Sequence, residues 1–316
     1  MKYCKPSLTI EEQIKLIESR GLFFENKANA TRHLSNISYY RLSAYMIPFK
    51  EKDSDGKVLD KFKPKSKWND IVTLYRFDRK FRLLMFDAIE RIEIGLRTQL
   101  IYQLSQKYGS HWHTNESIFK PITYIDKKTG ATINRNIYLE INKHIQEQLE
   151  SNKSTEFIKH YVSKYDSPPT PPSWMSVEIM YFNQLSLICS ALRNQKDLSD
   201  LANFYSLPKD IFTSWLHTIN YIRNICAHHS RLWNITLQVQ PAKLNFSKTK
   251  KWISSSATAQ SSKMYYTICT VLYFLQTINP NTKFKLHLSN LFDEFPSVNK
   301  GFMGFPNNWK DEDIWK

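Results

Sequence analysis

The sequence predicts a mainly α-helical fold, and three observations support that prediction. Only 7 of the 316 residues are Gly, where average usage is roughly 7%, and a chain so poor in Gly suits helices better than loop-rich β structure. Several long stretches repeat apolar residues at helical spacing. Near the N-terminus, Thr9 followed by Glu12 has the spacing of a helix capping box, and Gly21 supplies the stop signal.

Helical patterns cover most of the first half of the chain. They run over residues 8–20, 29–45, 69–108 and 140–165. Within the longest pattern, one apolar stripe spans about 80° at roughly 100° per residue, and its members are Phe81, Met85, Ala88, Ile92 and Leu96. The pattern over 69–108 fits either one helix with a kink or two helices in succession.

Two segments of the first half lack a helical pattern. Residues 50–67 are polar, with a turn at Asp55-Gly56 and a basic run from Lys61 to Lys67, which predicts a solvated loop. Residues 121–139 alternate on either side of a turn that contains Gly130, which predicts a small β-hairpin.

The segment Ser167–Pro172, with the sequence SPPTPP, is the clearest break in the chain. Four prolines in five residues favour an extended conformation and stop any helix, so the segment is either a linker or a rigid strap. It divides an N-terminal region, 1–165, from a C-terminal region, 166–316, and we expect the two regions to form one integrated fold. Helices are predicted over 173–192, 208–233 and 261–278, with irregular basic chain over 241–256 and loop over 291–316.

The excess of basic over acidic residues has two explanations. Lys and Arg number 44 against 29 Asp and Glu, for a net charge of +15. Excess charge can serve solubility alone, but a pI near 9.5 also makes nucleic acid the first candidate among partners.

The cysteines and the apolar segments indicate a cytoplasmic protein without a cofactor. Cys4, Cys189, Cys226 and Cys269 form no C-x-x-C pair, so neither a zinc site nor a disulfide framework is indicated, and reduced thiols are expected. The N-terminus lacks the apolar core of a signal peptide. The longest apolar run, residues 264–278, is shorter than the roughly 20 residues of a membrane span and predicts a buried helix.

The predicted helix 208–233 carries the candidate functional residues. At roughly 100° per residue, one polar stripe is formed by His217, Asn220, Asn224, His228 and Arg231, with Arg223 at its flank. The neighbouring His229 projects to the apolar side, where we expect it to pack.

Imidazole transfers protons near neutral pH and guanidinium binds phosphate. His228 is therefore the catalytic candidate for chemistry on a phosphodiester. A surface or interface histidine is the alternative for that position.

These residues also carry a resemblance. Arg223-Asn224-x-x-x-His228 looks like the R-x(4–6)-H signature of the HEPN superfamily of helical proteins. The wider string RNICAHHSRLWN resembles the hallmark of bacterial abortive-infection proteins of the AbiD/AbiF type. Three further segments are similar to elements of that family, in the same order: SYYRLSAYMIPF at 38–49, the helical pattern at 74–97, and PPSWMSVEIMYFNQLS at 171–186.

The resemblance implies a HEPN-like helical bundle with an N-terminal helical extension, and a metal-independent endoribonuclease that acts as a toxin in phage defence. His228 would be general base or general acid, Arg223 would bind the scissile phosphate, and Asn224 would orient His228 or a phosphate oxygen. Arg231 would be a second phosphate ligand or a support for the fold. Attack by the RNA 2′-OH needs no metal and leaves a 2′,3′-cyclic phosphate and a 5′-OH.

The resemblance also raises the question of partners. HEPN ribonucleases commonly juxtapose two motifs, and this chain has one, so either a homodimer or a divergent element would complete the site. A small structured RNA is an expected restraining partner. The alternative function is a non-catalytic RNA-binding protein in complex with such an RNA. Glu93 and Arg97, spaced i, i+4, form either a simple ion pair or a polar lining of the cleft.

Overall fold

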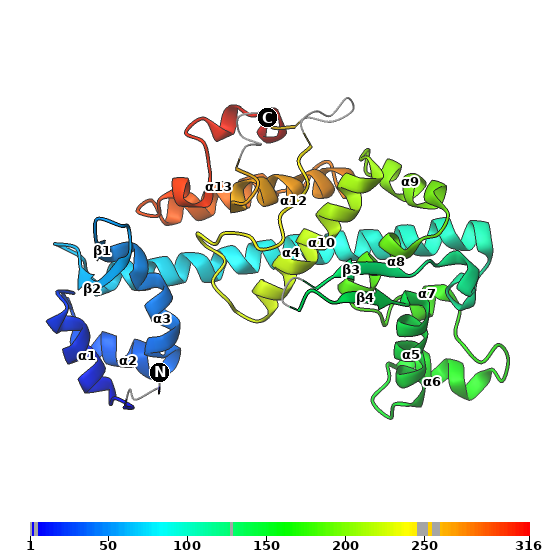
Figure 1. Ribbon diagram of the computed structural model, residues 1–316, viewed down its shortest axis with the longest axis horizontal. Helices are drawn as coiled ribbons and strands as arrows, with labels where there is room; N and C mark the ends of the chain where they lie inside the picture. The colour runs from blue at the N-terminus through cyan, green and yellow to red at the C-terminus, as the bar shows by residue number, and fades with distance from the viewer. Residues whose placement is uncertain (1, 3–5, 127–128, 245–251, 255–259) are drawn as a thin grey trace.

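A single helix of 41 residues, α4 (Trp68–Tyr108), runs through the middle of the molecule and organises the fold (Figure 1). The computed structural model describes residues 2, 6–126, 129–244, 252–254 and 260–316. Most of the described residues are helical, and the strands form two antiparallel two-stranded sheets. The mainly α-helical prediction is therefore confirmed, and residues 69–108 belong to one helix rather than two.

The elements before α4 form an N-terminal module at one end of it (Figure 1). They are α1 (Ile10–Ser19), α2 (Lys27–Ile37), α3 (Tyr39–Met46), the 3-10 turn η1 (Ile47–Phe49), β1 (Lys50–Lys52) and β2 (Val58–Phe62). The predicted capping box of α1 is confirmed, because the Glu12 backbone N–H donates to Thr9 Oγ1 and the Thr9 N–H donates to the Glu12 carboxylate.

Two predictions for this module were wrong. The single helix expected over 29–45 is broken at Ser38, whose φ of 68° lies in the left-handed region that a helix interior cannot accommodate. Ser38 then caps α3 through its side chain. The loop expected over 50–67 contains a β-hairpin, in which Lys50 pairs with Phe62 and Lys52 with Val58. The polar side chains hid the strands because only Phe62 of β2 is buried.

The second half begins beyond the other end of α4. It contains the 3-10 turns η2 (Trp112–Thr114) and η3 (Glu116–Ile118), β3 (Ile122–Ile125), β4 (Thr132–Arg135), α5 (Ile137–Glu150) and α6 (Glu156–Lys164). The hairpin prediction is confirmed in register from Ile122↔Arg135 to Ile125↔Thr132. The helix expected over 140–165 is two helices, because the backbone is extended at Ser151, with a ψ of 127°. The Ser154 hydroxyl donates to the Ser151 carbonyl within the connection between them.

The C-terminal helices differ more from the prediction. They are α7 (Ser173–Ser176), α8 (Phe182–Ala191), α9 (Gln195–Phe204), α10 (Lys209–Ala227), α12 (Met264–Ile278) and α13 (Phe284–Glu294), followed by η4 (Lys300–Met303), η5 (Trp309–Asp311) and η6 (Asp313–Trp315). Residues 173–192 form two helices, not one, and α9 and α13 were not predicted. The helix expected over 208–233 ends at Ala227. Of the irregular segment expected over 241–256, residues 245–251 and 255–256 lie outside the described residues.

The core lies around α4, α10 and α12. The predicted apolar stripe of α4 is at most 1% exposed, and α12 packs against it with twelve successive buried residues, from Met264 to Leu275. Helix α10 contacts α4, α8 and α9. Of the four cysteines, Cys189, Cys226 and Cys269 are buried and unbridged, and Cys4 lies outside the described residues. Among the described residues, no helix combines the length and the apolar character needed to cross a membrane.

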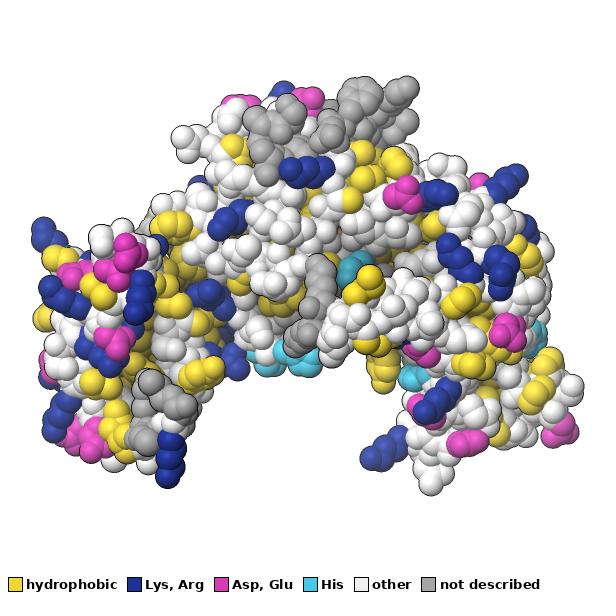
Figure 2. Space-filling model, in the orientation of Figure 1, with side chains coloured by type: hydrophobic (Ala, Val, Ile, Leu, Met, Phe, Trp, Pro, Cys, Tyr) yellow, Lys and Arg dark blue, Asp and Glu magenta, His cyan; other side chains and the backbone are white. Residues whose placement is uncertain are grey.

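The molecule has the outline of an arch. The N-terminal module and the α5–α6 pair project in the same direction from opposite ends of α4 (Figure 1). In the space-filling view they leave a wide hollow beneath the central body, and His side chains lie on the lower edge of that body, facing the hollow (Figure 2). Lys and Arg side chains lie beside them, toward the N-terminal module (Figure 2).

Candidate active site at the end of α10

Helix α10 ends in a Schellman turn that fixes the two adjacent histidines. The Ser230 N–H donates to the Ile225 carbonyl at 3.0 Å and the His229 N–H to the Cys226 carbonyl at 3.1 Å. This pattern requires a left-handed backbone at the first residue after the C-cap. His229 occupies that position, with a φ of 56°. His228 is the last residue before the turn, at the C-cap. The helix therefore ends six residues before the predicted end at residue 233.

The polar stripe predicted on α10 divides into residues that face solvent and residues that hold the fold. His217 and His228 are exposed, and partial enclosure by protein lowers the pKa of His217. Asn224 is half-buried. Asn220 is 7% exposed and donates to the Asn183 side chain of α8 at 3.3 Å, so it joins two helices. His228 thus remains available to a ligand, whereas Asn220 is engaged in packing.

Arg223 lies beside α4, close to Phe86 and near Glu93 of the predicted pair Glu93–Arg97. Its guanidinium stands 6.0 Å above the Phe86 ring and donates to the Asn224 side-chain oxygen at 3.4 Å. Burial raises the pKa of Glu93, and the positive charges of Arg97 and Arg223 oppose that rise. The structure therefore brings Arg223, Asn224, Glu93 and Arg97 into one neighbourhood.

Arg97 is engaged in the fold. It pairs with Glu93 at 3.0 Å and also donates to the Met180 carbonyl at 2.9 Å, in the segment that precedes α8. A weaker contact at 3.4 Å reaches Glu178. The Glu93–Arg97 pair thus ties α4 to the chain before α8 and lies beside Arg223, so it has a structural role and borders the candidate site.

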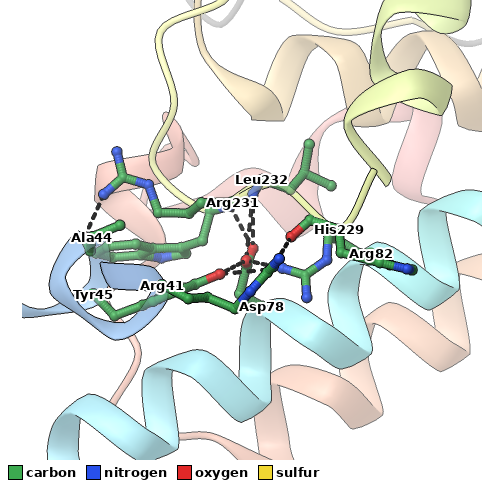
Figure 3. Close-up of polar contacts among 9 residues, drawn as sticks. Arg41, Ala44, Tyr45, Asp78, Arg82, His229, Arg231 and Leu232 are labelled. Atoms are coloured by element: carbon green, nitrogen blue, oxygen red, sulfur yellow. Dashed lines mark hydrogen bonds and ion pairs between the residues drawn. The ribbon is translucent and has the colours of Figure 1, made fainter. Parts of the chain in front are cut away.

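Arg231 does not lie on the helix face where the periodicity placed it. It follows the Schellman turn and donates to the Ala44 carbonyl of α3 at 2.6 Å (Figure 3). From the other side, Arg41 of α3 donates to the His229 carbonyl at 2.6 Å (Figure 3). These two reciprocal bonds hold α3 against the end of α10. The prediction for His229 was wrong as well, because its side chain is exposed rather than packed.

The segment after the turn is anchored on Asp78, a fully buried carboxylate of α4. Asp78 accepts the Trp233 N–H at 2.6 Å, the Leu232 N–H at 3.1 Å and the Tyr45 hydroxyl at 2.5 Å, and it pairs with Arg82 (Figure 3). Burial raises the pKa of Asp78, against the opposing effect of Arg82 and these hydrogen bonds. One carboxylate thus joins α3, α4 and the chain that follows α10, which satisfies buried donors that would otherwise be costly.

Two adjoining hollows open beside this junction. The first, of about 580 Å³, lies between α3 and the turn and is lined by Tyr40, Arg41, Lys50, His229 and Arg231 among others. The second, of about 490 Å³, lies between α4 and the end of α10 and is lined by Arg41, Arg79, Phe86 and His229 among others. Because Arg41 and His229 line both, we treat the two hollows as one recess, the α3–α10 recess.

Two residues that line the recess, Arg41 and Arg79, and the buried carboxylate Asp78 beside it were missed by sequence reasoning. Asp78, Arg79 and Arg41 come from segments remote from the R-x(4)-H string, so no local pattern connects them with it. A partial signal exists, because Tyr40 and Arg41 lie in segment 38–49 and Asp78 and Arg79 in segment 74–97, and both segments carry the resemblance. Within the described ranges, no group of three or more His, Cys, Asp or Glu side chains is placed to hold a metal ion.

Comparison with known proteins identifies the family of the chain. Residues 32–234 match the family described as Abi-like protein, a span that runs from α2 to the residue that ends the RLWN string. No curated protein and no solved structure matches the chain. The matched span covers well over half of the 316 residues and contains α3, α4 and the whole α10 turn. The chain therefore belongs to the Abi-like protein family, which links it to abortive infection and phage defence.

Proposed function

We propose that this protein is a metal-independent endoribonuclease of the HEPN type, acting as a toxin in phage defence. The observation that carries the proposal is the position of His228. Its side chain is exposed at the end of α10, on backbone fixed by the Schellman turn, in the same two turns as Arg223 and Asn224. The net charge of +15 supports a polyanionic substrate.

The proposed chemistry uses the nucleophile that RNA itself carries. His228 would remove the proton of the 2′-OH or protonate the 5′-oxygen that leaves. Arg223 would bind the scissile phosphate and stabilise the charge that develops on it, and Asn224, already in contact with Arg223, would orient that guanidinium. The 2′-oxygen forms the new bond to phosphorus as the P–O5′ bond breaks. The products are a 2′,3′-cyclic phosphate and a 5′-OH, and DNA would not be cut because it lacks the 2′-OH.

One chain supplies one Arg223–His228 pair in the described residues. Phe86, which stacks with Arg223, and Leu83 one turn earlier are both exposed, at 37% and 56%. An apolar patch beside a candidate site supports the proposal that a second copy of the chain docks here and completes the site. A small structured RNA is the proposed restraint on the toxin in the cell.

The test is cleavage of end-labelled single-stranded RNA in EDTA by the wild type and by His228→Ala. We expect the substitution to lower the rate by at least about 100-fold, the range of a lost general acid or base. His287→Ala is the matched control, since it removes another exposed histidine, on α13. The products should carry a 2′,3′-cyclic phosphate, detected by mass spectrometry. His229→Ala, tested in parallel, separates the two neighbouring histidines.

The same cleavage assay tests whether two copies of the chain together form one active site. If two copies form one composite site, a mixture of His228→Ala and Arg223→Ala chains should regain part of the activity. A mixed dimer keeps an intact Arg223 from one copy and an intact His228 from the other. Cleavage that survives His228→Ala in full would remove this histidine from the mechanism. RNA left intact by every protein, but still bound, would favour the non-catalytic RNA-binding function instead.

A further inference from the structure

The segment YYRL of α3 forms one wall of the α3–α10 recess, although it precedes the α10 turn by nearly 190 residues. Tyr40 is 89% exposed and lines the hollow of about 580 Å³. An aromatic ring this exposed contributes little to the core of the chain that presents it. It does offer a flat apolar face at the entrance to a positively charged recess.

The recess is rich in guanidinium groups that lack a carboxylate partner. Within the part of the chain that the structure describes, neither Arg41, Arg79 nor Arg231 takes part in an ion pair. Arg41 and Arg231 each donate to one backbone carbonyl, and Arg79 is exposed. Arg82 differs, because its charge is neutralised by Asp78. Unpaired cations gathered in a hollow favour an anion with more than one charge.

An exposed aromatic face combined with cations along a groove is the arrangement by which proteins hold single-stranded nucleic acid. Bases stack on the ring while guanidinium groups contact the phosphates. Inside a duplex the faces of each base already stack on the neighbouring base pairs, so a duplex gains only the phosphate contacts. The recess runs from Tyr40 past Arg41 to Arg79 and Phe86. The guanidinium of Arg223 lies over the Phe86 ring. One strand could therefore pass from Tyr40 to the candidate catalytic group.

We propose that the α3–α10 recess binds single-stranded RNA, with a base stacked on Tyr40 and the backbone phosphates contacted by Arg41 and Arg79. This inference rests on the proposed ribonuclease function and extends it, because it assigns the positioning of the substrate to α3 and α4. Arg41 also donates to the His229 carbonyl, so a substitution there would change both RNA binding and the shape of the α10 turn. Tyr40 and Arg79 have no such second role and are the cleaner probes.

The test measures binding of a short, fluorescein-labelled 2′-O-methyl RNA strand to the full-length protein by anisotropy. The blocked 2′-oxygen prevents cleavage by the proposed route, so binding is measured whether or not the protein is a nuclease. Tyr40→Ala should weaken binding by roughly 5- to 150-fold, the range for one stacked base, and Tyr40→Phe should restore it. Arg79→Glu should weaken binding about tenfold and lower the salt slope by about 1.

Matched controls lie elsewhere on the surface. Tyr102→Ala removes an exposed tyrosine of α4 that lines neither hollow of the recess, and it should leave binding unchanged. Lys196→Glu makes the same charge change as Arg79→Glu at an exposed position of α9. The neighbouring Gln195 accepts a hydrogen bond from Lys209 at the start of α10, so this control lies at the opposite end of α10 from the recess. Circular dichroism melting checks that each variant is folded.

Three results would overturn the inference: wild-type binding that is unaffected by Tyr40→Ala, equal losses for Arg79→Glu and Lys196→Glu, or a duplex that binds as tightly as the single strand. Failure of the proposed function gives a different result. In that case, binding still depends on Tyr40 and Arg79, while unmodified RNA stays uncut by the wild type.

Discussion

Two ion pairs on α4 have the same chemistry and the same spacing, an acidic residue followed four residues later by Arg, yet they have different roles. Asp78 and Arg82 are 0% and 6% exposed, and the carboxylate also binds the chain after α10 and the Tyr45 hydroxyl. Glu93 and Arg97 are 17% and 13% exposed and lie beside Arg223. The first pair closes a junction between three parts of the chain, whereas the second borders the candidate active site.

The difference teaches that the surroundings, not the spacing, decide what an ion pair does. A third pair, Asp87 and Arg91, has the same spacing again and is about half exposed. Pairs of that kind contribute a few tenths of a kcal/mol. A buried carboxylate that binds four donors cannot lose its charge without leaving some of them unsatisfied. The three pairs thus form a graded series on one helix.

The largest effect is expected for Asp78→Asn. The amide keeps the shape of the side chain, but its NH2 group cannot accept from Arg82, which is left charged and buried. We expect the free energy of unfolding to fall by about 3–5 kcal/mol, the usual cost of removing one partner of a buried pair. Denaturant titration followed by circular dichroism measures the loss.

The control for this prediction is Asp87→Asn on the same helix. It makes the same chemical change at an exposed pair, and it should alter the free energy of unfolding by no more than about 0.5 kcal/mol. Similar losses for the two variants would mean that burial of Asp78 does not distinguish the pairs.

A smaller effect, of a different sign, is expected for Glu93→Gln. Burial raises the pKa of Glu93 above its unfolded value of about 4.3. The folded state therefore favours the protonated form, and the contribution of Glu93 to stability is fully present below the unfolded pKa and is lost as pH rises through the folded pKa. Glutamine mimics the protonated form. At pH 7 the variant should be as stable as the wild type or more stable by up to about 1 kcal/mol.

This prediction is checked by measuring the free energy of unfolding at pH 7 and pH 4. The advantage of Glu93→Gln should shrink toward pH 4, where the wild-type carboxyl takes up its proton. Arg97 keeps the Met180 carbonyl and Glu178 as partners in the variant. A loss above about 2 kcal/mol at pH 7 would show that the charge of Glu93 stabilises the fold, in contrast to its raised pKa.

The helices that bury one full face could be predicted from the sequence, and those that depend on distant contacts could not. The stripe of α4 and the apolar helix α12 were predicted because burial imposes a period that the sequence displays. The break at Ser38 was missed because its left-handed backbone is fixed by how α2 and α3 pack. Helix α9 was missed although four of its residues are buried, since its 10 residues provide too short a pattern.

The candidate site shows the same limit. Local spacing placed Arg223, Asn224 and His228 within two turns of one helix, and the structure keeps them there. Arg231 and His229 were misplaced because the helix was extended through the Schellman turn, which has His229 where Gly is usual. Arg41 holds that turn and Asp78 holds the chain that follows it, across 188 and 155 residues of sequence respectively. Such partners leave no periodic signal near the motif.

The smallest effect, and the sharpest check on how the junction supports the site, is expected for His229→Gly. A left-handed residue other than Gly costs about 1 kcal/mol or more, while Gly adds conformational entropy to the unfolded chain. The free energy of unfolding should stay unchanged or rise by up to about 1 kcal/mol. The control is Ala227→Gly in the last helical residue, which should cost up to about 1 kcal/mol. If His229→Gly proves more destabilising than Ala227→Gly, the imidazole supports the fold. If it does not, the hydrogen bonds of Asp78 offset the free-energy cost of the positive φ at His229. The imidazole is then kept for its exposed position on the turn rather than for stability.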